Sequence, residues 1–373
     1  MESIINEFKG ISEENAIIKI IGVGGGGGNA VNNMFRNGLG GVSYLLINTD
    51  ETDLNNSPVQ HKISLASLGA GNDPKVAEEA ALKAEEEIKK AVSDGTKMAF
   101  ITACMGGGTG TGASPVVARI LKEMDILVVG IVTIPFAFEG KKKIKKALNW
   151  IETMTPYVDS LLVINNERLT QLKDFKLPLC FQFADNVLLN AARSISNIIN
   201  VPGYINIDFA DVRTTLLAGK MAVISTGEGD GEGRIKNAIA DAQSSLLLNN
   251  KNIWKSQKIL LNFYCSVDYA IEGGEVDQIR EFVDKMENEM DVIWGVTYDN
   301  DLDTRVKVTL LAAGEGTICP EEYEAEYREL EKVKKRQAKD GGEYDLSQFD
   351  TDDGTLAEMK VNEAITRKRN KQN

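Results

Sequence analysis

Short runs of apolar residues alternate with longer amphipathic segments along the first half of the chain. The runs, rich in Val and Ile, are Ile17–Val23, Val42–Ile47, Met98–Ala103, Leu127–Thr133 and Leu161–Ile164. Strands buried on both faces have this composition, so the runs predict a parallel sheet covered by helices such as Pro74–Ser93 and Ser114–Met124. The pattern indicates an α/β domain that binds ligands at the carboxyl ends of its strands.

A long helix and a second, smaller α/β unit are predicted next. Leu188, Ala191, Ile195 and Ile199 recur at spacings of three and four, as in the apolar stripe of a helix near 183–200. Apolar runs and helical patterns then alternate again, over Met221–Ser225, Arg234–Leu246, Ile259–Phe263, Val276–Met290, Val292–Val296 and Val306–Ala312. From about Gly316 the chain becomes charged: Glu321–Lys339 is a candidate helix, and the Asp- and Gly-rich segment 340–355 is typical of disorder.

The composition of the chain argues against several classes of function. The formal net charge of −13 over 373 residues argues against nucleic-acid binding. Four separated cysteines and one histidine lack zinc-site spacing and suit reduced thiols in a cytosolic protein. Met1 to Ala16 has no signal-peptide pattern, and the apolar stretch Ile126–Phe138 is too short to span a bilayer, so we expect no direct membrane insertion.

The first predicted strand runs directly into a glycine-rich segment, Gly22–Asn29, followed by a helical pattern. Such a loop lets backbone N–H groups approach a phosphate at a helix N-terminus. The segment satisfies G-x-G-x-x-G, and Asp50 follows the second strand, so a nicotinamide-dependent oxidoreductase is one alternative. The chain contains no Walker-type G-x-x-x-x-G-K-[ST] motif.

A second glycine loop, Met105–Gly112, follows the strand Met98–Ala103 and again precedes a helix. A dinucleotide-binding oxidoreductase needs one phosphate loop, whereas here two strands of one sheet each end in one. The N–H groups of both loops, with the hydroxyls of Thr109 and Thr111, could surround several phosphates. The alternative is that the segment is merely a flexible turn. It does not explain the many glycines, because each glycine in an ordered loop costs conformational entropy and usually has a geometric reason.

The heptapeptide Gly106–Gly112, Gly-Gly-Gly-Thr-Gly-Thr-Gly, resembles the signature of the tubulin/FtsZ family. Other segments resemble FtsZ motifs in FtsZ order over residues 17–315: Gly24–Ala30, Asn48–Asp50, Gly69–Gly71, Pro135–Lys141 and Asn206–Arg213. The resemblance implies a tubulin/FtsZ-like α/β fold with a parallel-sheet, Rossmann-like GTPase domain, a long central helix and a second α/β domain. The expected divisions are a disordered N-terminus (1–16), a GTP-binding domain (17–180), the central helix (181–203), a GTPase-activating domain (204–315) and a charged, largely disordered tail (316–373).

The resemblance also implies that the chain binds GTP or GDP, with Mg²⁺ held mainly by phosphates and water. The phosphates are expected on Gly25–Asn29 and Gly106–Gly112, and the ribose near Thr133, Pro135 and Glu139. The nucleotide-binding residues expected in this way are Gly25, Gly26, Gly27, Gly28, Asn29, Asn48, Gly69, Ala70, Gly71, Gly106, Gly107, Gly108, Thr109, Gly110, Thr111, Gly112, Thr133, Pro135, Glu139, Lys143, Phe181, Asp185 and Asn186. Asp185 has an alternative role as a helix N-cap, and Lys143 stands where the family often has arginine.

In the family, hydrolysis takes place where one subunit's loop enters the nucleotide site of the next, and this implies catalytic roles for Asn206, Asp208 and Asp211. Capping a helix is the alternative role of the two aspartates. The resemblance implies head-to-tail filaments at a mid-cell division site, with a GTPase stimulated by assembly. A nucleotide-binding paralogue with little hydrolysis is the other alternative. The tail lacks the apolar terminal peptide typical of FtsZ, so adaptor partners are expected without their identity.

Overall fold

The computed structural model describes residues 16–66, 68–171, 177–244, 256–285 and 290–314, with residues 320, 323–325, 327–328 and 330–332. The predicted disordered N-terminus therefore lies outside the described residues except for Ala16, and so does most of the predicted tail. Of the predicted charged helix Glu321–Lys339, the described residues are those between 323 and 332.

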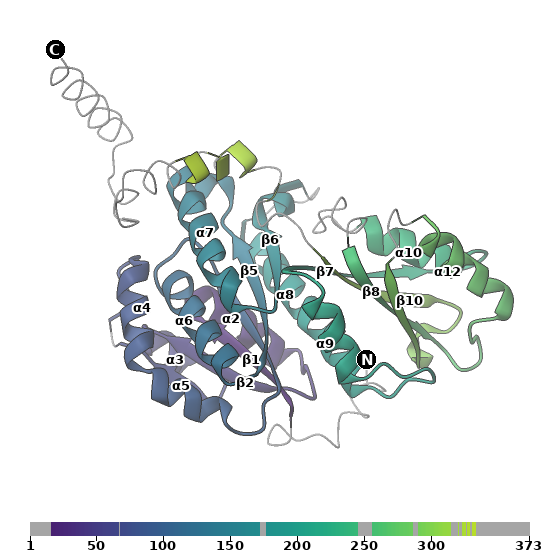
Figure 1. Ribbon diagram of the computed structural model, residues 1–373, viewed down its shortest axis with the longest axis horizontal. Helices are drawn as coiled ribbons and strands as arrows, with labels where there is room; N and C mark the ends of the chain where they lie inside the picture. Colours follow the sequence, from purple (N-terminus) through teal and green to yellow (C-terminus); the bar gives the residue numbers. More distant parts are fainter. Residues whose placement is uncertain are drawn as a thin grey trace, which may run out of the picture.

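The first domain is built on six parallel strands in the order β3-β2-β1-β4-β5-β6 (Figure 1). They are β1 (Ile18–Val23), β2 (Ser43–Asn48), β3 (Lys62–Ser64), β4 (Met98–Cys104), β5 (Leu127–Ile134) and β6 (Ser160–Asn165). Every residue of β1, β2 and β5 is buried, which explains why these runs are continuously apolar. The predicted parallel sheet is confirmed, with β3 as an additional short edge strand.

Helices cover both faces of this sheet. On one face pack α4 (Pro74–Lys83), α5 (Glu85–Val92), α6 (Thr109–Glu123) and α7 (Lys141–Met154); on the other pack α2 (Gly24–Arg36), α3 (Glu51–Asn56) and α8 (Leu177–Asn200). The helix predicted over Pro74–Ser93 is two helices separated at Ala84. Three glutamates, 85–87, occupy the first turn of α5, where negative charge stabilises a helix start.

The second domain continues the sheet with β7 (Met221–Gly229), β10 (Val306–Gly314), β8 (Ser256–Cys265) and β9 (Asp291–Tyr298), in that spatial order. β10 runs antiparallel to β7 and β8, while β9 is parallel to β8. One residue pair, Leu161 and Met221, joins the two parts of the sheet between β6 and β7. Among the described residues, this domain also contains the helices α9 (Phe209–Leu217), α10 (Arg234–Ser244) and α12 (Val276–Val283).

The long helix α8 lies between the two domains (Figure 1). Its predicted apolar stripe is buried at Leu188, Ala191 and Ile195, and Ile199 packs against the same core. This core also contains residues of β8 and β10, so α8 packs on both domains. The helix begins at Leu177 and ends at Asn200, two residues before Pro202.

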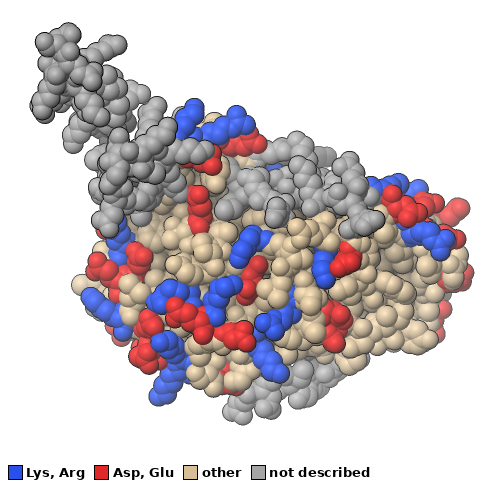
Figure 2. Space-filling model, viewed as in Figure 1, with Lys and Arg blue, Asp and Glu red and all other residues tan. Residues whose placement is uncertain are grey.

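The surface carries charge of both signs. Figure 2 shows Lys and Arg interspersed with Asp and Glu on one face of the molecule, most densely over α4 and α5. Among the described residues, no helix is both long and apolar enough to cross a membrane.

Candidate functional site

Two helices begin side by side at the carboxyl ends of β1 and β4. α2 starts at Gly24, directly after β1, and α6 starts at Thr109, after the loop that follows β4. A Cβ atom placed on Gly24 would lie 2.6 Å from the backbone nitrogen of Gly110, so the two helix N-termini are in contact. Gly24 also has φ of +73°, a conformation that residues with a side chain rarely adopt.

Neither N-terminus is capped by a side chain, and neither first turn contains an acidic residue. By contrast, Asp50, Asp73 and Asp208 cap α3, α4 and α9. The first N–H groups of α2 and α6 therefore have no partner inside their helices, and the helix dipoles add positive potential at the same place. This is the arrangement that binds a phosphate chain.

The glycines of the first loop lie inside α2, which corrects the prediction of a loop before the helix. Gly24 to Gly28 form its first turns because the helix packs directly against β4. A Cβ atom on Gly26 would lie 2.4 Å from Sγ of Cys104, and one on Gly27 would lie 2.3 Å from the carbonyl oxygen of Thr102. The missing side chains thus allow the helix N-terminus to approach the strand.

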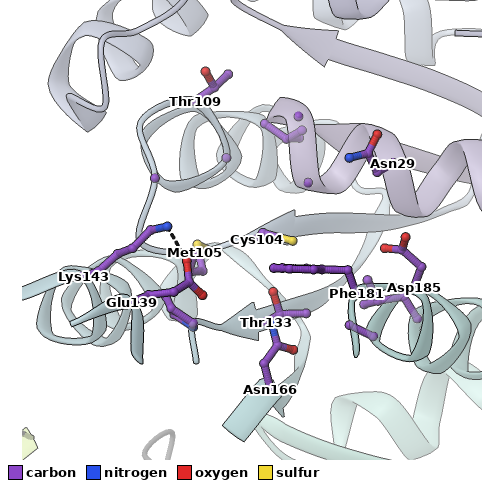
Figure 3. A pocket seen from close by; sticks show the side chains of 18 of the residues that line it. Asn29, Cys104, Met105, Thr109, Thr133, Glu139, Lys143, Asn166, Phe181 and Asp185 are labelled. Carbon is purple, nitrogen blue, oxygen red and sulfur yellow. Dashed lines mark hydrogen bonds and ion pairs between the residues drawn. The ribbon is translucent and has the colours of Figure 1, made fainter. Parts of the chain in front are cut away.

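The helix α8 supplies the opposite side of the site (Figure 3). The ring of Phe181 is half-exposed and packs edge-on against Phe136, with ring centroids 5.4 Å apart. Asp185 lies one turn further along, and burial raises the pKa of its carboxyl to about 6. The alternative that Asp185 is an N-cap is wrong, because the helix begins eight residues earlier, at Leu177.

An ion pair between Glu139 and Lys143 forms another wall (Figure 3). Glu139 also accepts a hydrogen bond from the backbone N–H of Phe136, at 2.9 Å, through its other oxygen. Both oxygens of this carboxylate are thus engaged by the protein. Lys143, the cationic partner of this pair, is partly exposed to solvent.

Together these elements enclose a pocket of about 400 Å³, large enough for a nucleotide. The predicted residues that line it are Gly25, Gly26, Asn29, Gly107, Gly108, Thr109, Gly110, Thr133, Pro135, Glu139, Lys143, Phe181 and Asp185. They come from β5, α2, α6, α7 and α8 and from the loops after β4 and β5, so segments up to 160 residues apart in sequence meet here.

The other predicted nucleotide-binding residues do not line this pocket. Thr111 is fully buried, and its hydroxyl accepts a hydrogen bond from the N–H of Gly106 at 2.9 Å, so it stabilises the loop from within. Asn186 points away and accepts a hydrogen bond from Asn33 at 3.1 Å. The remaining members of this set are Gly27, Gly28, Asn48, Gly69, Ala70, Gly71, Gly106 and Gly112.

Several lining residues were not predicted: Val23, Cys104, Met105, Asn166, Ala184 and Leu188. Asn166 follows β6, and its position at the carboxyl end of a predicted strand was the available signal. Cys104 ends β4, and burial raises the pKa of its thiol to about 11, so it is protonated at neutral pH. The predicted role of buried cysteines as small apolar residues suits Cys265, which lies in the core of the second domain.

Asp208 and Asp211 lie apart from the pocket, at the start of α9. Each accepts a hydrogen bond from the backbone N–H of the other, at 2.9 and 3.0 Å, in a reciprocal helix cap. Asn206 accepts from the N–H of Gly203 at 3.1 Å. Asp185 and the end of α8 at Asn200 are about 22 Å apart along the helix axis, and α9 begins beyond that end. The three side chains cannot reach the pocket of their own chain.

Family models and known proteins match this architecture. Residues 17–174 match the GTPase domain of the Tubulin/FtsZ family, and residues 220–316 match the C-terminal domain of the FtsZ family. A cell division protein FtsZ from Porphyromonas gingivalis is 50% identical over 305 residues, which is 80% of this chain and 67% of that protein. FtsZ from Aquifex aeolicus is 37% identical over 381 residues, covering 100% of this chain and 99% of that one.

A solved structure described as an empty FtsZ dimer from M. jannaschii aligns with a TM-score of 0.70 and 36% identity, covering 84% of this chain and 91% of that chain. The paired helix N-termini and the matched GTPase domain define a GTPase of the tubulin/FtsZ class. Both domain matches and the identities of 37–50% then narrow the class: this chain belongs to the FtsZ family.

Proposed function

We propose that this chain performs the function of its family, that of a self-assembling cell-division GTPase, by binding GTP in the pocket and hydrolysing it between adjacent subunits. The observation that supports this most strongly is the contact between the uncapped N-termini of α2 and α6 at one pocket. A single helix N-terminus suits one phosphate group, whereas two suit a chain of phosphates.

Base recognition is assigned to Phe181 and Asp185. Guanine presents two adjacent donors, N1–H and N2–H₂, which match the two oxygens of one carboxylate, while adenine has no such pair. With a pKa of about 6, Asp185 is mainly ionised at neutral pH and can accept both hydrogen bonds. The exposed face of Phe181 offers a surface for stacking against the base.

Mg²⁺ is proposed to bind mainly through phosphate oxygens and water. Within the described part of the chain, no group of three or more His, Cys, Asp or Glu side chains could hold a metal ion. Coordination by phosphate oxygens and water is common for Mg²⁺, which retains much of its water shell. The ion would supply positive charge to the phosphate oxygens during hydrolysis.

The attacking water is assigned to Asp208 and Asp211 of the adjacent subunit, with Asn206 beside them. Each aspartate uses one oxygen in the cap of α9 and keeps the other for a water molecule. A head-to-tail contact brings this loop against the pocket of the next subunit and leaves both ends of the assembly open, so it generates filaments. Filaments at the mid-cell division site in the cytoplasm, with adaptors bound to the tail, complete the proposal.

The test is phosphate release from GTP with Mg²⁺ over a series of protein concentrations. Specific activity that rises steeply above a threshold is expected, because the site forms only between subunits. Specific activity independent of concentration would contradict the assignment of Asp208 and Asp211. GTP binding without hydrolysis at any concentration would favour the non-hydrolysing paralogue.

A further inference from the structure

Described residues between 320 and 332, here termed the C-terminal strap, follow the last strand of the second domain but pack on the first. Tyr323 and Leu330 are 4% and 1% exposed and belong to the core beneath α4, α6 and α7. Tyr327 packs against the same core. Figure 1 shows the strap as short yellow-green helical pieces at one end of α7. The strap therefore connects the chain after β10 to the GTPase domain.

Tyr323 reaches the wall of the nucleotide pocket. Its hydroxyl donates a buried hydrogen bond, 3.1 Å long, to the carbonyl oxygen of Pro135, 188 residues earlier in the chain. Pro135 lines the pocket, and its ring lies so close to Gly106 that a Cβ atom there would be 2.7 Å from Cγ of Pro135. Pro135 thus contacts both the strap and the start of the second glycine loop.

The turn after β5 is fixed at three consecutive residues. The N–H of Phe136 donates to Glu139 at 2.9 Å, and the N–H of Ala137 donates to Glu167 at 2.7 Å. Pro135 has no N–H group, so its carbonyl is the backbone group through which it can be held. Tyr323 provides that bond from a different part of the chain, so the position of the turn depends on the strap.

We propose that Tyr323 is a positioning residue for the guanine nucleotide, acting through Pro135, and that strap docking and nucleotide binding favour each other. This inference rests on the proposed nucleotide site. A turn held in the bound geometry binds more tightly because less conformational freedom is lost on binding. The coupling is reciprocal: removing the strap weakens nucleotide binding, and bound nucleotide holds the strap on the domain.

The first test is Tyr323→Phe, which removes the hydroxyl and keeps the ring in the core. GDP is the probe, since its binding can be titrated by calorimetry without hydrolysis. The affinity for GDP is expected to fall on the order of threefold to tenfold, the effect of one hydrogen bond. In GTP turnover KM should rise, while kcat at saturating GTP stays unchanged, because Tyr323 touches no reacting atom.

Tyr44→Phe is the matched control. The Tyr44 hydroxyl also donates to a backbone carbonyl, that of Leu39, at 2.6 Å in a buried setting, and neither residue lines the pocket. Tyr44→Phe should lose about as much thermal stability as Tyr323→Phe, because each variant lacks one buried hydrogen bond. Unlike Tyr323→Phe, it should keep its affinity for GDP. Two truncations extend the test: deleting residues 320–373 should lower GDP affinity at least as much as Tyr323→Phe, and deleting residues 340–373 should leave affinity and polymerisation intact.

Unchanged GDP affinity in Tyr323→Phe would overturn the inference, whatever the truncations do. An equal loss in Tyr44→Phe would also overturn it, because the effect would then be general destabilisation. If the unaltered protein bound no GDP, the proposed nucleotide site would fail instead, so the two failures can be told apart.

Discussion

At Asp185 the proposed role in base recognition conflicts with the stability of the fold. Because burial raises its pKa from near 4 to about 6, the protonated form is favoured in the folded state. The stability contributed by this group is fully present below pH 4 and is lost as the pH rises through about 6. At neutral pH the buried carboxylate therefore destabilises the nucleotide-free protein.

We predict that Asp185→Asn stabilises the nucleotide-free protein at pH 7.5 by about 1–2 kcal/mol and leaves it nearly unchanged near pH 4. The same variant should bind GDP at least about tenfold more weakly, since it lacks a charged acceptor for the two guanine donors. Urea unfolding at both pH values, with GDP titration at pH 7.5, measures both effects. A variant that is less stable than the unaltered protein at pH 7.5 would refute this account.

Asp208 both caps a helix and, in our proposal, helps to place a water molecule. The two roles can be separated, because asparagine caps helices as well as aspartate does but carries no charge. Asp208→Ala should lower the free energy of unfolding by about 1 kcal/mol, whereas Asp208→Asn should not. Both variants should lose phosphate release on the order of a hundredfold. If Asp208→Asn hydrolyses GTP normally in pelleted filaments, the aspartate is only a cap.

At the scale of elements, substitutions in α2 can show whether its glycines are needed for close packing against β4 or for flexibility of the backbone. A Cβ atom on Gly27 would lie 2.3 Å from a backbone oxygen of β4, whereas one on Gly28 would have no neighbour within 4 Å. Gly27→Ala should therefore destabilise the protein by roughly 2 kcal/mol or more, because the strand cannot yield. Gly28→Ala should stabilise it by about 0.5–1 kcal/mol and keep its GDP affinity, since alanine retains the N–H group.

Thermal unfolding of the two variants without nucleotide gives the comparison. Equal stability of Gly27→Ala and Gly28→Ala would contradict a packing role for Gly27. If Gly28→Ala folds with increased stability but binds no GDP, the prediction for Gly28 is wrong, and the nucleotide needs the space that the added methyl group fills.

The strands could be predicted from the sequence because burial on both faces makes them continuously apolar, and each predicted run lies within or next to an observed strand. The start of α2 could not, since a run of five glycines has poor helix propensity and becomes helical only by packing on β4. The short edge strand β3 and the division between α4 and α5 also lacked a periodic signal.

In the candidate site too, features that depend on tertiary packing could not be predicted from the sequence. The glycine loops indicated the phosphate region, because loop glycines have a direct geometric role. Leu188 was not predicted to line the pocket, since only the packing of α8 against the first domain brings it there, whereas Asn166 was overlooked although it directly follows β6. The hydroxyl of Thr111 was misassigned because sequence cannot show which side of a loop a side chain faces.

At the scale of the whole molecule, α9 lies away from the pocket of its own chain, and we propose that one chain supplies the pocket and another the carboxylates that place the water. Two inactive variants can test this directly. Asp211→Asn keeps the pocket and loses a carboxylate, while Gly107→Trp keeps α9 and fills the pocket. Gly107 lines the pocket, and a Cβ atom on it has no neighbour within 4 Å, so the fold should accept this change.

An equimolar mixture of Asp211→Asn and Gly107→Trp should recover about a quarter of the activity of the unaltered protein, because in random head-to-tail filaments that fraction of contacts joins an intact pocket to an intact α9. Each variant alone should remain inactive. Phosphate release is measured beside sedimentation, which establishes that both variants enter the same filaments. Co-sedimentation without recovery would mean that the pocket and the carboxylates do not meet across the contact. Recovery requires a site divided between two subunits, since neither chain in the mixture contains a complete one.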